Sequence, residues 1–351
     1  MSEKREFTLR LLQKGSGRTA SVSISQEALG VPTILELKGD TRETYLYGLT
    51  PGARVDWGDG ETDLTDESFA PTPKIIRHSY SGTVATPRIV TIYGSRSLTG
   101  GTKLGRSPFD RENLIGVRRL AEQYSDLSYL FARCHALRSI PATLFEQNKG
   151  ATKLEGCFLE CRSLTTLPAS LFEGMSRLTS LHFCFQDCTE LKSLPEGLFN
   201  DCRAETFSNC FQACTSLRSL PRDLFARQTV AKDFSGCFIG CTGLTAIPDG
   251  LFDTASMATD FSGCFSDCNS LTAIPRGLFD NQHYATDFKR CFRGCDALQG
   301  ETPYALVDSR RIKLWERDPA ANGYAKVKES TNCFAYATQL TDYGTIPGGW
   351  K

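Results

Sequence analysis

Pairs of cysteines four residues apart are the residues of this sequence whose types and spacing most suggest chemistry. Cys237 and Cys241, in the segment DFSGCFIGCTGLTAIPDGLF, form one such pair. Two thiolates at this spacing could bind zinc, form a disulfide or act as a redox pair, whereas two thiols could equally be small apolar side chains of a core. The chain has 15 cysteines in 351 residues. That number would suit a disulfide-stapled secreted protein, but the inference applies to small domains with little core.

The cysteine pairs belong to a repeat with a step of 27 residues and one step of 26. In each unit a leucine follows the second cysteine by three residues, and in the first six units an Ile-Pro or Leu-Pro pair and then a Leu-Phe pair complete the motif. The second cysteines are Cys134, Cys161, Cys188, Cys214, Cys241, Cys268 and Cys295. A fixed period of this length indicates a solenoid, in which each unit buries its apolar face against its neighbours.

Within a unit, the spacing of apolar residues predicts the local structure. The Leu-x-x-Ile/Leu segment before the proline predicts an extended segment that stacks on its copies. The proline then allows a short helix or turn. The pattern Phe-x-x-Cys-Phe-x-x-Cys, preceded by a polar residue such as Asp233, predicts one face of a capped helix. The variable stretch between the Leu-Phe pair and this pattern predicts a surface loop.

This register favours packing as the role of the cysteines. Leu130 replaces the first cysteine in the first unit, and Ala337 replaces the second cysteine in the last unit, opposite Cys333. Leucine and alanine can substitute for a packing cysteine but not for a metal ligand. Zinc binding and native disulfides remain alternatives, although cysteines four apart on a helix are poorly placed for bridging.

The repeated motif CFxxCxxLTxIPxxLF resembles the leucine-rich repeats of BspA-like bacterial surface proteins, in particular the 26-residue type. The resemblance covers about residues 113 to 298. It implies a right-handed leucine-rich solenoid that is displayed outside the cell and used for binding or adhesion. The first residues, MSEKREFTLRLLQKGSG, lack the apolar core of a secretory signal. We therefore expect a cell-surface or secreted protein from the resemblance, with a virion or cytoplasmic product assembled into a particle as the alternative.

Residues 1–98 show alternating apolar and polar stretches that predict an all-β sandwich. The WGDG turn at residues 57–60, together with His78 and Tyr80, is similar to the polycystic-kidney-disease-type (PKD) immunoglobulin-like domain. Residues 99–112 are rich in glycine and basic residues, and predict a linker. The predicted fold class is therefore α+β: a PKD-like sandwich, the linker, and a leucine-rich-repeat solenoid of 27-residue coils over 113–298 whose first coil is degenerate.

The acidic residues of the WGDG region could bind calcium, because hard oxygen ligands clustered on a turn suit that ion. These residues are Asp56, Asp59 and Glu61. The favoured interpretation is a tight turn in which aspartate accepts backbone hydrogen bonds and glycine supplies a positive φ.

Residues 299–351 interrupt the regular step and predict a hairpin insertion, a last degenerate coil and a cap. The surplus segment alternates apolar and polar residues about a Val-Asp-Ser-Arg-Arg turn. Trp315, Tyr324, Tyr343 and Trp350 are expected to cover the open end of the solenoid, as terminal repeats must. An exposed aromatic patch for a partner is the alternative.

Several classes of function have no support in the sequence. Forty basic residues balance forty acidic ones, so no bulk field recruits nucleic acid or an anionic membrane, and no apolar run is long enough to span one. The four histidines have no metal-binding spacing, and no GxSxG, HExxH or phosphate-binding loop is present; they are His78, His135, His182 and His283. We expect no enzyme, no cofactor and no resident metal.

The remaining hypothesis is a non-catalytic binding or adhesion protein whose partner is a protein or a glycan. The position just after the motif leucine predicts a polar strip along the solenoid with a basic N-terminal half. Its members are Arg138, Thr165, Lys192, Arg218, Thr245 and Thr272. The alternatives are solvated residues that contact no partner and, for the whole protein, a structural or receptor-binding component of a phage virion or injection apparatus.

Overall fold

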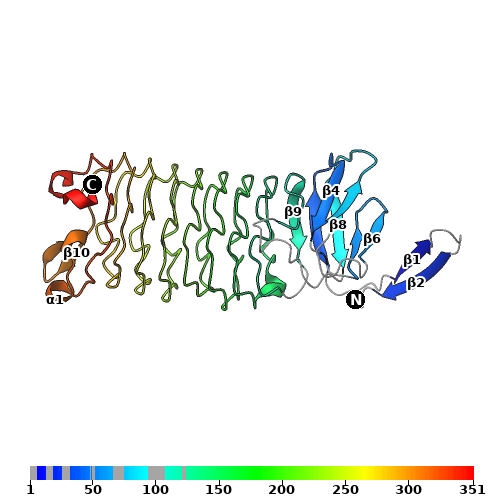
Figure 1. The fold of residues 1–351 in the computed structure, drawn as a ribbon, viewed down its shortest axis with the longest axis horizontal. Helices are drawn as coiled ribbons and strands as arrows, with labels where there is room; N and C mark the ends of the chain where they lie inside the picture. The colour runs from blue at the N-terminus through cyan, green and yellow to red at the C-terminus, as the bar shows by residue number, and fades with distance from the viewer. Residues whose placement is uncertain are drawn as a thin grey trace.

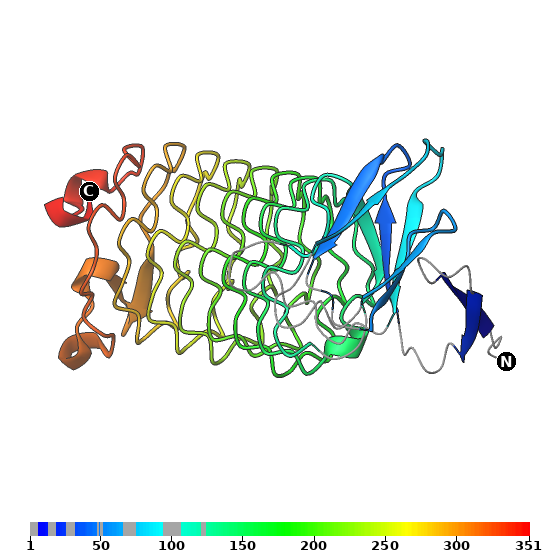
Figure 2. The ribbon, with the colours of Figure 1, turned by 45° about the vertical axis from the view of Figure 1, so that its right-hand side comes forward.

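The computed structural model describes residues 6–12, 19–25, 32–47, 49, 52–65, 75–93, 107–120 and 124–351. The molecule is elongated, with β-strands at one end, a long stack of coils, and a C-terminal segment at the other end (Figure 1). In the turned view of Figure 2 the coils are loops of similar size stacked along the long axis.

Two antiparallel sheets occupy the N-terminal end of the stack. The larger has the order β6-β5-β8-β3-β9 and the smaller pairs β4 with β7. The strands are β3 (Thr33–Leu37), β4 (Glu43–Tyr47), β5 (Arg54–Asp56), β6 (Thr62–Leu64), β7 (Ile75–Ser79), β8 (Arg88–Tyr93) and β9 (Leu114–Arg119). A separate hairpin pairs β1 (Glu6–Leu12) with β2 (Thr19–Ser25). The alternation that predicted strands is visible in β3, whose residues are alternately buried and half-buried.

Strand β9 joins the N-terminal sheet to the coils. It pairs antiparallel with β3, and Gly116 also forms a parallel bridge with Ser139 of the first coil. Phe109, just before β9, is fully buried and its ring lies 5.3 Å from the ring of Phe131. The linker predicted over 99–112 therefore ends before residue 107, and residues 99–106 lie outside the described residues. One hydrophobic core runs from the N-terminal sheet through the coils to Trp350.

The coils are held together by parallel bridges at one position per repeat. The bridged residues are Asp126, Lys153, Ser180, Thr206, Asp233, Asp260, Asp287 and Glu329. Several aspartates in this column also accept a hydrogen bond from the backbone N–H two residues later, as Asp233 does from Ser235 at 2.9 Å. The polar residue expected to cap a helix instead orders a turn.

The helix predicted for Phe-x-x-Cys-Phe-x-x-Cys is wrong. Between residues 124 and 298, all of which are described, the only helical element is the 3-10 turn η3 (Glu146–Asn148). In the cysteine segment, alternate N–H groups donate to the next coil, and the others donate to the carbonyl three residues earlier and close four-residue β-turns. Those donating to the next coil belong to Phe234, Gly236, Phe238 and Gly240. Those closing turns belong to Cys237, Ile239 and Cys241. The segment is therefore a run of turns, and the α component of the predicted α+β class is absent from the coils.

Backbone conformation explains why turns replace the helix. The residue before each cysteine of a pair has a positive φ, as Gly236 (60°) and Gly240 (67°) do. An α-helix has negative φ throughout, whereas the third residue of a type II turn requires a positive value. A Cβ at Gly236 would also lie 2.3 Å from Asn209 Oδ1 of the preceding coil. Glycine therefore suits this position on both counts.

The core of the stack consists of ladders of identical side chains. The phenylalanine after the first cysteine stacks on its copies with ring centroids 5.3–5.7 Å apart, from Phe131 to Phe334. Such aromatic pairs add about 0.5–1.5 kcal/mol each beyond the burial of their area. Trp350 continues the ladder at 6.4 Å from Phe334.

All fifteen cysteines are free thiols in the buried core. The thiol of the second cysteine donates a hydrogen bond to a phenylalanine carbonyl of the preceding coil; for Cys241 the acceptor is Phe211 O at 3.2 Å. The same contact recurs at 3.0–3.3 Å for Cys161, Cys188, Cys214, Cys268 and Cys295. Burial raises the pKa of Cys241 to about 12, so the side chain is a neutral thiol at physiological pH. These contacts support the interpretation of the cysteines as packing residues.

The C-terminal segment closes the stack. The predicted hairpin is confirmed as β10 (Tyr304–Val307) paired with β11 (Arg310–Lys313). It is followed by η4 (Leu314–Glu316), α1 (Pro319–Asn322), η5 (Tyr343–Thr345) and η6 (Gly348–Trp350). Phe334 N donates to Trp350 O at 2.8 Å, which adds one more rung after the last coil. The four aromatic residues expected at this end are buried or half-buried: Trp315, Tyr343 and Trp350 pack at the core, and Tyr324 lies against His283 and Arg317.

Arg317 provides, at the end of the stack, a hydrogen bond that elsewhere comes from the next coil. In the stack, the carbonyl of the Leu-Phe phenylalanine accepts a hydrogen bond from a polar side chain of the next coil. Gln228 donates to Phe199 O, Thr254 to Phe225 O and Gln282 to Phe252 O, at 2.6–2.7 Å. At the last of these carbonyls, Phe279 O, the donor is Arg317 Nη2 at 2.7 Å, and Nη1 also reaches Gln282 O at 3.0 Å.

Candidate binding surface

The six residues of the predicted strip lie in one column on the outside of the stack. Five are exposed and Thr165 is half-buried. Backbone hydrogen bonds link neighbouring members: Lys192 N to Thr165 O, Thr245 N to Arg218 O and Thr272 N to Thr245 O, each 3.2 Å. No regular strand forms in this segment, so the predicted extended segment is held by these single hydrogen bonds between described coils.

The buried leucine columns fix the direction of the strip. Leu137 and Ile140 point into the core with 0% and 8% of their surface exposed, so the two residues between them point outward. The second outward position carries small side chains, all of them exposed. These residues are Ser139, Thr166, Ser193, Ser219, Ala246 and Ala273. A column of small exposed side chains therefore runs beside the strip along its whole length.

Positive charge is concentrated in the N-terminal half of the strip. Arg138, Lys192 and Arg218 make no ion pair with any residue that the structure describes. By contrast, nearby Arg133 binds Glu160 at 2.9 Å. Glu190, two residues before Lys192 in the chain, is exposed and also lacks an ion pair among the described residues.

The C-terminal half of the strip has less capacity to bind a partner. Thr245 Oγ1 donates to Arg218 O at 3.3 Å, and Thr272 Oγ1 donates to Thr245 O at 3.2 Å. These hydroxyl protons are already used between coils. Free charge and free hydrogen-bond donors therefore lie mainly between Arg138 and Arg218.

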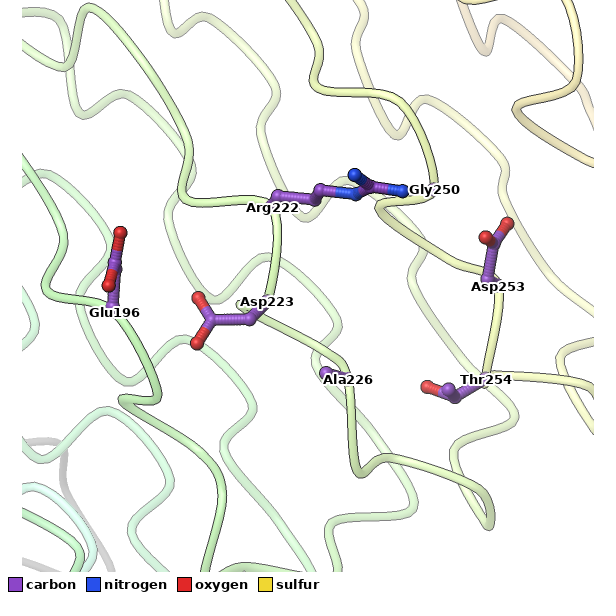
Figure 3. A pocket seen from close by; sticks show the side chains of 7 residues that line it. All are labelled: Glu196, Arg222, Asp223, Ala226, Gly250, Asp253 and Thr254. Atoms are coloured by element: carbon purple, nitrogen blue, oxygen red, sulfur yellow. The ribbon is translucent and has the colours of Figure 1, made fainter.

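A groove that sequence reasoning missed lies at the Pro-x-x-Leu-Phe edge of three successive coils (Figure 3). Its volume is about 440 Å³, and it is lined by Glu196, Arg222, Asp223, Ala226, Gly250, Asp253 and Thr254. In Figure 3 the Asp223 carboxylate points toward Glu196, and the Arg222 side chain extends toward Gly250. Acidic residues within five positions of the proline in three successive repeats, Glu196, Asp223 and Asp253, were the sequence signal for this edge. The lining holds no nucleophile paired with a base.

The acidic residues of the WGDG loop form turns in the structure. Asp56 Oδ1 accepts from Gly58 N at 2.9 Å, and Asp59 Oδ1 accepts from Glu61 N at 3.1 Å. Asp59 Oδ2 lies 2.8 Å from His78 Nε2. Burial would raise the pKa of Asp59, but its hydrogen bonds, above all the one with His78, hold that pKa below its ordinary value. Three of the four Asp oxygens of this loop thus have protein partners, which favours the turn over a calcium site.

The motif residues of the same loop pack as one cluster. The Trp57 and His78 rings are stacked at 4.8 Å, and the Tyr80 ring lies edge-on to His78 at 4.5 Å. Tyr80 OH donates to Trp57 O at 3.1 Å, and Trp57 Nε1 donates to Asp63 Oδ2 at 2.8 Å. His78, which lies in strand β7 opposite Thr44 of β4, is therefore a buried structural residue.

The histidines beside cysteines form no thiol–imidazole pair. His135 Nδ1 lies 3.1 Å from Glu112 Oε1, whereas the neighbouring Cys134 thiol is buried and donates to Ser107 Oγ. Burial raises the pKa of Cys134 to about 12. His182 Nδ1 lies 3.1 Å from Ser208 O. Cys184, two residues after His182, is also fully buried, and burial raises its pKa, so neither Cys134 nor Cys184 is placed as an activated nucleophile.

No group of three or more His, Cys, Asp or Glu side chains in the described residues could hold a metal ion. None of the helices in the same residues has the length and apolar character needed to cross a bilayer.

The fold and this surface together define a capped stack of repeats with an exposed, partly basic column. No family model matches the chain, and no curated protein matches it. Among solved structures, the chain is similar to a leucine-rich cell surface protein of Faecalibacterium prausnitzii A2-165, with 16% sequence identity and a TM-score of 0.24. The match covers 61% of this chain and 74% of that chain.

Proposed function

We propose that this protein is a non-catalytic binding or adhesion protein that presents the exposed columns of its solenoid to a protein or glycan partner. We assign the coils to the BspA-like leucine-rich repeats because the repeated motif supplies every buried column of the stack. We assign the N-terminal sheets to the PKD-like sandwiches because Trp57, His78 and Tyr80 pack as one cluster. On this assignment the protein acts at the cell surface or after secretion.

The observation that carries the proposal is a row of exposed cations that make no ion pair within the described part of the chain. The fixed core holds Arg138, Lys192 and Arg218 in one exposed column, in a chain whose formal net charge is zero. A partner that supplied anionic or hydrogen-bonding groups would meet cations whose backbone positions the core fixes at regular intervals, so only their side chains have to become ordered on binding. A repeat stack can vary these outward positions without changing its core.

The test is a variant in which the six strip residues are replaced together by alanine. We expect it to keep the circular dichroism and melting temperature of the parent chain, because surface side chains of this kind contribute little to stability. We also expect it to lose binding to host cells and to glycan arrays. Unchanged binding by a folded variant would refute the assignment of the strip.

A further inference from the structure

We propose that the partner of the strip is a linear anionic polysaccharide, held by Arg138, Lys192 and Arg218; this rests on the proposed function above. The three cations are exposed and make no ion pair with any described residue. Neighbouring coils in such a stack are about 4.8 Å apart, so Lys192 and Arg218 lie about 5 Å apart along the axis and Arg138 about 10 Å from Lys192. A chain with regularly repeated anionic groups, running along the axis, could meet all three.

The absence of an apolar anchor disfavours a protein partner. Protein interfaces draw most of their binding energy from buried aromatic and other large side chains. The strip and its neighbouring small-residue column contain Arg, Lys, Thr, Ser and Ala only. The exposed large apolar side chains of the described residues all lie elsewhere: Leu64, Ile75, Val84, Val230, Met257, Tyr284, Leu306 and Tyr336.

The same composition disfavours a neutral glycan. An uncharged sugar ring is held mainly through its apolar faces and hydroxyl groups, which fit sites lined by aromatic and other apolar side chains. No aromatic residue stands at either outward position from Arg138 to Ala273. Carboxylate or sulfate groups, by contrast, fit the guanidinium forks of Arg138 and Arg218, which can donate two parallel hydrogen bonds.

The neighbouring column provides room for a linear chain. Ser139, Thr166, Ser193 and Ser219 are exposed and small, so a polymer can lie beside the cations without a steric barrier. The hydroxyls of Thr245 and Thr272 already donate between coils. Binding of the polysaccharide is therefore confined to the N-terminal half of the strip, and substitutions at the two threonines should have little effect on the affinity.

The experiment measures binding of the full chain to immobilised polygalacturonate and chondroitin sulfate, with dextran and polyglutamate as neutral and polypeptide controls. The test variant is R138Q/K192Q/R218Q. The matched control is R177Q/R203Q/R227Q, which removes the same charge from exposed arginines of the variable loops that also make no ion pair with a described residue. Circular dichroism confirms that both variants are folded.

We expect the parent chain and the control to bind one of the anionic polysaccharides with affinities within about threefold, and the strip variant to bind at least tenfold more weakly. The slope of log K against log salt should fall by about 2 to 3 in the strip variant, since each lost contact removes about one released counterion. Dextran and polyglutamate should bind more weakly than the anionic polysaccharides.

Three results would overturn the inference: no binding to either polysaccharide, an equal loss in both variants, or equal binding of polyglutamate. Loss of cell binding in the strip variant without any binding to polysaccharides would overturn it while leaving the proposed function intact. Cell binding that survives in the strip variant, together with absent polysaccharide binding, would contradict both.

Discussion

The replacement of Arg317 by alanine should open the C-terminal end of the stack. The Arg317 side chain is 5% exposed and satisfies two carbonyls of the last regular coil, Phe279 O and Gln282 O. Its guanidinium also lies 4.5 Å from the centre of the Tyr324 ring. Burial lowers the pKa of Arg317 to about 10, so the group is still protonated at neutral pH.

The expected loss of stability is about 3 kcal/mol. Each buried carbonyl left without a donor costs roughly 1–3 kcal/mol, and the loss of the contact with Tyr324 adds about 1 kcal/mol. Part of this loss is offset because a desolvated charge is also removed. Arg317→Gln should recover part of the difference, because Gln228 and Gln282 make the equivalent contact with Phe199 O and Phe252 O.

Hydrogen–deuterium exchange of the full chain separates this local effect from global unfolding. In Arg317→Ala we expect faster exchange in residues 279–299 and 314–350, unchanged exchange in residues 124–200, and an intermediate result for Arg317→Gln. Arg310→Ala, at the exposed hairpin turn, is the control. Unchanged protection at the C-terminal end in Arg317→Ala would refute the view that this side chain replaces a coil.

Three further predictions concern the core, the cap and the N-terminal loop. Cys241→Ala should lower the free energy of unfolding by about 1–2 kcal/mol in urea titrations, because it removes one buried sulfur and one hydrogen bond, while the exposed neighbour Thr242→Ala should be neutral; equal effects would contradict the packing role. Burial raises the pKa of Asp342, but the hydrogen bond from Lys313 at 2.7 Å and others hold it below its ordinary value of 3.8. This carboxylate thus stabilises the fold above pH 3.8 and the contribution is lost as the pH falls through its lower folded pKa, so Asp342→Asn should be destabilising at pH 7 and approach the parent in acid; a pH-independent difference would argue against this. Calcium and EDTA should leave the melting temperature unchanged, because the aspartate oxygens of loop 56–61 already accept protein hydrogen bonds; a rise with calcium would restore the metal interpretation.

The buried columns of the coils could be predicted from the sequence because the repeat samples the same environment many times. Positions such as Leu137, Phe238 and Cys241 are fully buried, as their register required. Leu130 and Ala337, which replace cysteines at the two ends, are buried as well. The hairpin after residue 303 could also be predicted, since apolar alternation about a polar turn is a local signal.

The helix could not be excluded by apolar spacing alone. A compact run of turns places residues i, i+3, i+4 and i+7 on one side much as a helix does, so the burial pattern is the same. The discriminating signal was glycine: Gly236 and Gly240 precede the two cysteines of one pair, where a helix interior would lose about 1 kcal/mol per glycine. Hydrogen bonds to the next coil, which no single repeat reveals, replace those of the helix.

Two features could not be predicted because they depend on contacts between distant segments. They are the pairing of β9 with both the N-terminal sheet and the first coil, and the capping of the last coil by Arg317. Strand β9 pairs with β3, about 80 residues earlier in the chain, and with the first coil. The position of the polar strip could be predicted because its residues alternate with buried leucines. That Arg138, Lys192 and Arg218 make no ion pair with a described residue could be learned only from the positions of the surrounding side chains. The acidic groove at the Pro-x-x-Leu-Phe edge likewise depends on how three coils stack.

The most direct test of the scaffold is to count the thiols of the native protein. Purified without reductant, the protein should show almost no alkylation while folded, fifteen alkylated cysteines after unfolding in denaturant, and no stoichiometric zinc by elemental analysis. Fewer than fifteen thiols after unfolding, with disulfides between neighbouring coils mapped by mass spectrometry, or one equivalent of bound zinc, would contradict the claim that these cysteines only fill and order the core.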